Sequence, residues 1–311
     1  QKWGHDKILS DVVWVIRNFK PDVIITRFPT TGEGGHGHHT SSAILAGEAF
    51  DAAADPNKFP EQLKNGVSIW KARRLLWNTF NFGGNNTQRE DQLKIDVGMY
   101  NPILGKSYGE MAAESRSQHK SQGFGVPAQR GETFEYFATI KGDKPVLDLM
   151  DGIDISSKRM GEPAGANYNE LVSKMIRMYN PSMPQQSITS LESLYEMVMQ
   201  IKDSYKLNTI KELIARCAGL FMEATTLNQL NVVGDSLKFS VSFNNRTGIP
   251  LEMAQVSIFG TTQVFDNLKA NVTNVKSASV YIPKESVVTQ PYWLEYALKE
   301  GSYDVRNQEF I

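Results

Sequence analysis

The chain has 311 residues, of which 41% are hydrophobic and 22% are charged, and its formal net charge is -1. This length allows about two domains, because single hydrophobic cores stop growing at about 250–300 residues. The near-zero charge argues against a phosphate-neutralising surface, so we expect no nucleic-acid partner. No apolar stretch approaches the ~18 residues that span a bilayer, so we expect no membrane span.

The N-terminal part of the chain alternates helical and strand patterns. Apolar residues recur at helical spacing from Asp6 to Phe19, and Pro21 follows where this helix must stop. A short β-branched run within residues 22–28 suits a strand that is buried on both faces. A glycine-rich loop, residues 30–39, then leads into an alanine-rich helix over about residues 40–54.

The next elements continue this alternation. Strands are predicted at residues 74–80, 95–100 and 133–140, and a helix at residues 108–122. Strand and helix in alternation imply βαβ units. We therefore predict an α/β domain over residues 1–150 with a Rossmann-like, mainly parallel sheet.

Two further blocks follow. Residues 151–230 are predicted to form a helical connector, with capping-box signatures at Thr189–Glu192 and Thr209–Glu212. From residue 231 to 311 the apolar period changes to two, which predicts a β-sandwich-like module whose core includes Trp293. Its strands are expected near residues 237–243, 252–259, 277–282 and 292–298.

Three histidines, His36, His38 and His39, fall within four residues of the glycine-rich loop. Packing does not explain such a cluster between a buried strand and a helix. In open α/β sheets, ligands bind at the carboxyl ends of strands, where this loop is expected. The cluster therefore indicates a functional site, whereas His119, in a charged helical segment, is predicted to be a surface residue.

The histidine spacing disfavours two common zinc sites. A zincin needs His-Glu-x-x-His on a helix, but Gly37 follows His36. A metallo-β-lactamase-like site has the pattern His-x-His-x-Asp-His, but this chain continues from His38 with His39 and Thr40. A His36-x-x-His39 pair remains at the helix entrance, and two histidines rarely complete a zinc site, so other ligands are needed.

The run from Pro21 to Thr26, followed by Gly35-His36-Gly37-His38-His39, resembles the second motif of the LmbE/PIG-L family of zinc-dependent N-deacetylases, in its larger multidomain bacterial type. Residues 115–118 are similar to a later His-x-Ser-Gln motif, with Ser115 in place of histidine. The resemblance covers about residues 1–150. It implies hydrolysis of the N-acetyl amide of an amino sugar in a glycoconjugate, such as an N-acetylglucosaminyl-phosphatidylinositol, with release of acetate.

The resemblance also implies roles for individual residues. His39 corresponds to a zinc ligand, and His36 to the histidine that assists proton transfer or stabilises the oxyanion. His38 stands where relatives carry asparagine or aspartate. The family's His-Pro-Asp-Asp-Glu motif, which supplies other ligands and the general base, has no match here, and His5-Asp6 lacks its proline and paired acids. We therefore expect the chain, which begins at Gln1, to lack its first βα units and to be inactive by itself.

Two residues near the histidines each have two possible roles. Glu33 is either an acceptor that orients an imidazole or a solvent-exposed loop residue. Arg27, at the end of the predicted strand, either holds an anionic substrate group or pairs with a nearby acid.

A competing hypothesis is a non-catalytic glycan-binding or scaffolding protein with a relic deacetylase domain. The sequence does not fix the localisation. The resemblance favours the bacterial envelope or periplasm, because multidomain members of the family are commonly exported.

Overall fold

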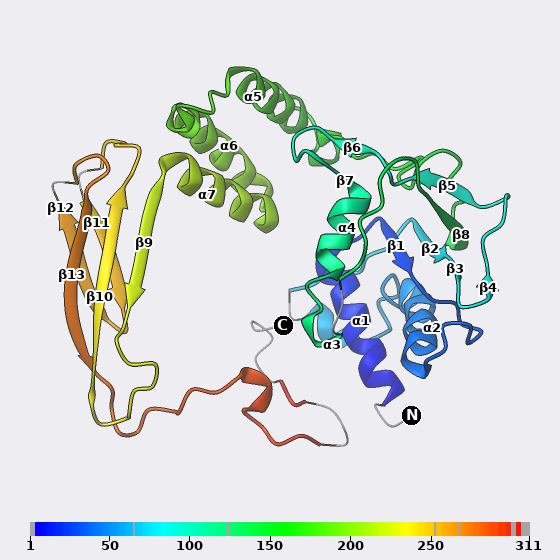
Figure 1. Ribbon diagram of the computed structural model, residues 1–311, viewed down its shortest axis with the longest axis horizontal. Coiled ribbons are helices and arrows are strands. Elements are labelled where there is room, and N and C mark those ends of the chain that lie inside the picture. Colours follow the sequence, from blue (N-terminus) through cyan, green and yellow to red (C-terminus); the bar gives the residue numbers. More distant parts are fainter. Residues whose placement is uncertain are drawn as a thin grey trace. The chain divides into compact units, whose positions relative to one another are not determined.

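The computed structural model describes residues 4–64, 66–122, 125–251, 253–266, 268–299 and 303–305. The chain divides into two compact units (Figure 1). Unit 1 runs to Asp154 and takes in the described residues 296–299 and 303–305, and unit 2 covers Ile155–Glu295. Within the described residues, every helix is too short or too polar to traverse a bilayer.

Unit 1 begins with a helix, a strand and a second helix. Helix α1 (His5–Phe19) ends at Lys20, which adopts a left-handed conformation with φ 56°. Strand β1 (Val23–Thr26) follows, and helix α2 (Gly37–Ala52) packs against α1. The apolar stripe of α1 meets the alanine-rich face of α2 in a buried cluster of Leu9, Val13, Ile16, Ala49, Ala52 and Ala53.

The central sheet of unit 1 has the strand order β1-β2-β8-β5. Strand β2 (Arg74–Thr79) runs parallel to β1, and α2 lies between them in the chain, so one βαβ unit is present. Strand β8 (Phe134–Gly142) is antiparallel to both of its neighbours, β2 and β5 (Leu93–Asp96). The fold is thus mixed α/β.

The prediction of a mainly parallel sheet is wrong for the described strands, because only the β1–β2 pair is parallel. After β2 the chain enters a hairpin of β3 (Asn81–Phe82) and β4 (Asn85–Asn86) and reaches β5 without a helical crossover. A parallel neighbour needs such a crossover. Strand β8 instead enters between β2 and β5 in the opposite direction.

Two predicted elements of unit 1 are shorter than expected. The strand expected at residues 95–100 ends at Asp96, whose carboxylate accepts hydrogen bonds from the backbone N–H groups of Gly98 and Thr133. The helix expected over residues 108–122 is α4 (Tyr108–Arg116), followed by a 3₁₀ turn at Lys120–Gln122. Short strands β6 (Tyr100–Asn101) and β7 (Lys106–Ser107) precede α4, and the short helix α3 (Pro60–Leu63) follows α2.

Arg17 of α1 is fully buried, although it belongs to a helix whose buried face is otherwise apolar. Its guanidinium donates to the carbonyl oxygens of residues 52, 53, 55, 58 and 59 and to Gln62 Oε1. These groups lie at and beyond the end of α2. Since five backbone acceptors surround one side chain, Arg17 fixes the path of the chain as it leaves α2.

The first part of unit 2 is helical. Helices α5 (Ala164–Met178), α6 (Ile188–Ile201) and α7 (Ser204–Ala218) enclose a core of Leu191, Leu194, Val198 and Ile210. Neither predicted capping box forms. Thr189 lies inside α6, and Thr209 lies inside α7, where its hydroxyl donates to the Tyr205 carbonyl. Asp203 caps α7 instead, because its carboxylate accepts from the Lys206 N–H.

The second part of unit 2 consists of strands. Strands β9 (Leu220–Thr225) and β13 (Thr273–Tyr281) flank β10 (Ser236–Asn245), and β11 (Met253–Ile258) pairs with β12 (Thr261–Asp266). The two sheets share a core of Phe239, Val241, Phe243, Val256 and Phe265. The helical block therefore ends at Ala218, before the expected boundary at residue 230. The strand expected at residues 292–298 is wrong, since Tyr292–Leu294 is a 3₁₀ turn with Trp293 exposed.

Candidate functional site

The histidine loop, residues 27–39, connects the carboxyl end of β1 to the start of α2. His36 is the N-cap residue of α2, with extended backbone angles, and His38 and His39 lie in the first turn. Gly34 permits the loop to close on itself, because a Cβ there would lie 2.8 Å from Phe28 Cδ1 and 3.2 Å from His39 Cβ. The cluster lies beyond the carboxyl end of β1, as predicted, but the prediction that this strand is buried on both faces is wrong, because β1 is at the edge of the described sheet and Ile25 is 48% exposed.

The loop brings the three imidazoles into mutual contact. The ring centroids of His38 and His39 lie 4.3 Å apart, and those of His36 and His39 lie 5.2 Å apart. The His36 and His38 centroids are separated by 5.5 Å. His36 and His38 are exposed, whereas His39 is half-buried. Of the three rings, His39 is therefore the one that the surrounding protein holds most closely.

His39 is fixed by two contacts. Its ring stacks on Phe28 with a centroid separation of 3.8 Å and an interplanar angle of 2°. Its Nδ1 lies 2.9 Å from the carbonyl oxygen of Gly34. Because a carbonyl only accepts, Nδ1 carries a proton, and in the neutral imidazole Nε2 then presents a lone pair. This is the arrangement of a metal-ligating histidine, whose second nitrogen is usually held by a carbonyl or carboxylate.

The fit of the loop to a zinc ion is partial. His39 supplies one oriented nitrogen ligand of the kind that zinc takes. Among the described residues, however, no group of three or more histidines, cysteines, aspartates or glutamates has a geometry that could hold a metal ion. The described residues therefore fit one position of a coordination sphere, with no described group to complete it.

Arg27 belongs to a polar cluster at the carboxyl ends of β1 and β2. Its guanidinium donates to Asn78 Oδ1 and lies 3.4 Å from Glu135 Oε2, while Asn78 Nδ2 donates to the same Glu135 oxygen at 2.7 Å. The alternative in which Arg27 pairs with an acid is thus the one observed. Since about half of the Arg27 side chain is exposed, it still borders solvent beside the histidine loop.

Glu33 is exposed and accepts a hydrogen bond of 2.5 Å from the Thr31 hydroxyl. This bond, together with the residue's own backbone N–H, holds the pKa of the Glu33 carboxyl below its usual value. Among the described hydrogen bonds, none joins Glu33 to an imidazole. His119 is exposed beyond the end of α4, and Ser117 of the 115–118 segment donates to the Ala113 carbonyl.

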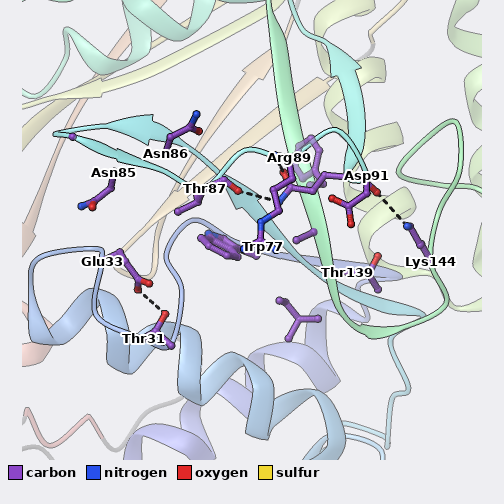
Figure 2. A pocket seen from close by; sticks show the side chains of 15 residues that line it. Thr31, Glu33, Trp77, Asn85, Asn86, Thr87, Arg89, Asp91, Thr139 and Lys144 are labelled. Carbon is purple, nitrogen blue, oxygen red and sulfur yellow. Dashed lines mark hydrogen bonds between the residues drawn. The ribbon is translucent and has the colours of Figure 1, made fainter.

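A polar cleft of about 700 Å³ lies beside the histidine loop (Figure 2). Thr31 and Glu33 of the loop form one side, and Trp77 at the end of β2 lies between them and the β3–β4 hairpin. Further lining residues are Asn85, Asn86, Arg89, Asp91, Thr139 and Lys144. Trp77 was not among the site residues predicted from the sequence. The available signal is a tryptophan at a strand end followed by the asparagine- and glycine-rich stretch of residues 81–86.

No protein-family model, no curated protein and no solved structure matches this chain.

Proposed function

We propose that this chain belongs to an N-deacetylase of the LmbE/PIG-L type, which hydrolyses the N-acetyl amide of an amino sugar in a glycoconjugate. One observation carries the proposal: His39, beyond the carboxyl end of a strand with a parallel partner, has Nδ1 engaged by the Gly34 carbonyl, and among the described residues no hydrogen bond engages its Nε2. The β1–α2–β2 unit supports a Rossmann-like origin for the sheet, since a Rossmann-like sheet is assembled from such units.

His39 is proposed as a zinc ligand through Nε2. When bound, zinc supplies a hydroxide nucleophile near neutral pH and polarises a carbonyl group. The stacking of His39 on Phe28 and its bond to Gly34 restrict ring rotation, so the ligand nitrogen has a fixed direction before any ion arrives. Such preorganisation is what a catalytic metal ligand requires.

His36 is proposed as the proton donor. As the N-cap residue it is exposed at the mouth of the loop, and its ring centroid lies 5.2 Å from that of His39. An imidazole there can hydrogen-bond the oxyanion of a tetrahedral intermediate and pass a proton to the leaving nitrogen. The N-terminus of α2 adds a favourable partial positive charge for the same oxyanion.

The competing hypothesis is a glycan-binding protein without hydrolytic activity, and the Trp77 cleft is the observation that favours it. The two hypotheses differ in a direct assay. Acetate release from an N-acetylglucosaminyl conjugate is measured with the longest native polypeptide that contains residues 1–311, with excess zinc and after chelation. The proposal predicts zinc-dependent release, whereas binding of the conjugate with no release under either condition would support the alternative.

A further inference from the structure

We propose that the Trp77 cleft is a saccharide-binding subsite that holds a neutral sugar ring adjoining the one that carries the N-acetyl group. The substrate class is then an oligosaccharide rather than a single amino sugar. The identification of the ligand as a glycan rests on the proposed function. The cleft's volume of about 700 Å³ falls within the ~300–1,000 Å³ of typical ligand sites.

Trp77 supplies the apolar surface for such a ring. Its indole N–H donates to the Arg27 carbonyl at 3.3 Å, and the side chain is half-buried. Its cross-strand partner on β8 is Ala138, which also lines the cleft. Paired residues of neighbouring strands point to the same face, so this small side chain leaves room beside the indole. A sugar ring presents apolar C–H groups on its faces and hydroxyls at its edge, which suits a tryptophan surrounded by polar groups.

Polar side chains that can hydrogen-bond a ligand lie around the indole. Asn85 and Thr139 line the cleft, and within the described part of the chain their side chains have no recorded hydrogen-bond partner. Asn86 Oδ1 accepts from the Gln88 N–H at 3.0 Å, and among the described residues no hydrogen bond engages its amide nitrogen. Amides and hydroxyls both donate and accept, which matches the dual character of sugar hydroxyls.

The charges that line the cleft favour a neutral ligand. Two cations, Arg89 and Lys144, are matched by two carboxylates, Glu33 and Asp91. The cleft therefore has no excess of positive charge that would select a phosphate or a uronic acid. Because Thr31 and Glu33 belong to the same loop as His36, a sugar in the cleft would extend from a ring placed at the histidines (Figure 2).

The test is calorimetric titration of the zinc-free protein with N-acetylglucosamine, with its β-1,4-linked tetramer and with a tetrameric uronic acid. We expect the tetramer to bind at least about tenfold more tightly than the monosaccharide, and the uronic acid not to compete. Trp77→Ala should weaken tetramer binding by about tenfold, as for loss of an aromatic stacking contact, and Trp77→Phe should retain most of it.

Controls separate binding from folding. The Asn85→Ala variant changes only an exposed hairpin side chain, so it should weaken binding with an unchanged melting temperature. Trp293→Ala removes an exposed tryptophan of unit 2 and should leave binding unchanged. Equal affinity for monosaccharide and tetramer, preference for the uronic acid, or loss of binding with Trp293→Ala but not with the cleft variants would overturn the subsite.

Tetramer binding and acetate release are measured separately, so the subsite and the deacetylase activity are tested independently. Tetramer binding in the cleft without acetate release would retain the subsite and remove the deacetylase. Acetate release from a monosaccharide conjugate, with no gain in affinity for the tetramer, would retain the deacetylase and remove the subsite.

Discussion

At the scale of single residues, the histidine loop holds one imidazole in place and leaves two imidazoles exposed. His39 is held by Phe28 and by the Gly34 carbonyl, whereas His36 and His38 lie in solvent within 5.5 Å of each other. A fixed ring suits a metal ligand. A proton-transfer residue contacts the substrate both with and without its proton, so an imidazole that is free to turn suits this role.

The first prediction concerns His36. In the longest native polypeptide that contains this chain, His36→Ala should lower kcat by about 10²-fold, as for a lost proton-transfer or oxyanion partner. Zinc content should stay the same, since His39 keeps its contacts. The measurements are acetate release and metal analysis, with the exposed His119→Ala variant as control. Loss of zinc in His36→Ala, with retention in His39→Ala, would reverse the assignment of the two residues.

The second prediction concerns pH. His5 Nδ1 lies 2.8 Å from Asp6 Oδ1 and its Nε2 lies 2.7 Å from Glu48 Oε2 on α2. The hydrogen bond to Asp6, then that to Glu48, raises the pKa of His5 above 6.5 in the folded protein. The stabilisation is therefore fully present below the unfolded-state value of about 6.5 and is lost as pH rises through the folded-state pKa.

The measurement is urea unfolding of wild type and His5→Gln between pH 5.5 and 9. Wild type should be the more stable at pH 5.5, and the difference should vanish at the alkaline end. Because His5 is about half exposed, added salt should shrink the difference. A stability gap that grows with pH would contradict the assigned role.

At the scale of elements, Ser107 and Glu110 form the capping box of α4. The Ser107 hydroxyl accepts from the Glu110 N–H at 3.2 Å, and Glu110 Oε2 accepts from the Ser107 N–H at 2.9 Å. Ser107→Ala should lower the free energy of unfolding by about 1 kcal/mol, the typical cost of losing an N-cap. Chemical denaturation measures it, with Ser115→Ala at an exposed position in the last turn of α4 as control, which should cause no loss.

The same elements show what local sequence can predict. Ser107, Thr189 and Thr209 each begin the pattern Ser/Thr-x-x-Glu, but of these three only Ser107 is the N-cap of a helix. The pattern predicts a cap only where the preceding chain is extended, and that condition is set by neighbours outside the four residues. Amphipathic α1 was predictable from its helical periodicity, and β1 from its short β-branched run.

Such local patterns do not predict strand direction or buried polar contacts. The apolar content of β8 is compatible with either direction, so its antiparallel insertion between β2 and β5 was not predictable from its residues. Arg17 gave no signal of burial, since its acceptors come from the chain after α2. At the site, the histidine cluster follows from sequence proximity, whereas the Trp77 cleft requires β2, β8 and the hairpin to meet.

At the scale of the whole molecule, each unit has its own hydrophobic core. Phe265 is 1% exposed and lies in the β core of unit 2, with its ring 5.7 Å from that of Phe243. Phe265→Ala should cost about 3–5 kcal/mol. Hydrogen exchange should show lost protection in β10, while β2 of unit 1 stays protected.

The neighbouring Val264→Ala variant, at a 37% exposed position on the same strand, is the matched control and should change protection little. Equal loss of protection in β2 and β10 after Phe265→Ala would show that the two units unfold as one body.

The proposed presentation of His39 Nε2 to zinc can be measured by zinc titration of the protein labelled with ¹⁵N in its imidazoles. We expect zinc to shift the Nε2 resonance of His39 while its Nδ1 remains protonated, and we expect His39→Ala to abolish binding where His119→Ala does not. Since no described group of three ligands surrounds His39, binding to residues 1–311 should be weak enough for dialysis to remove the ion. Zinc bound at Nδ1, or bound with unchanged affinity by His39→Ala, would contradict it.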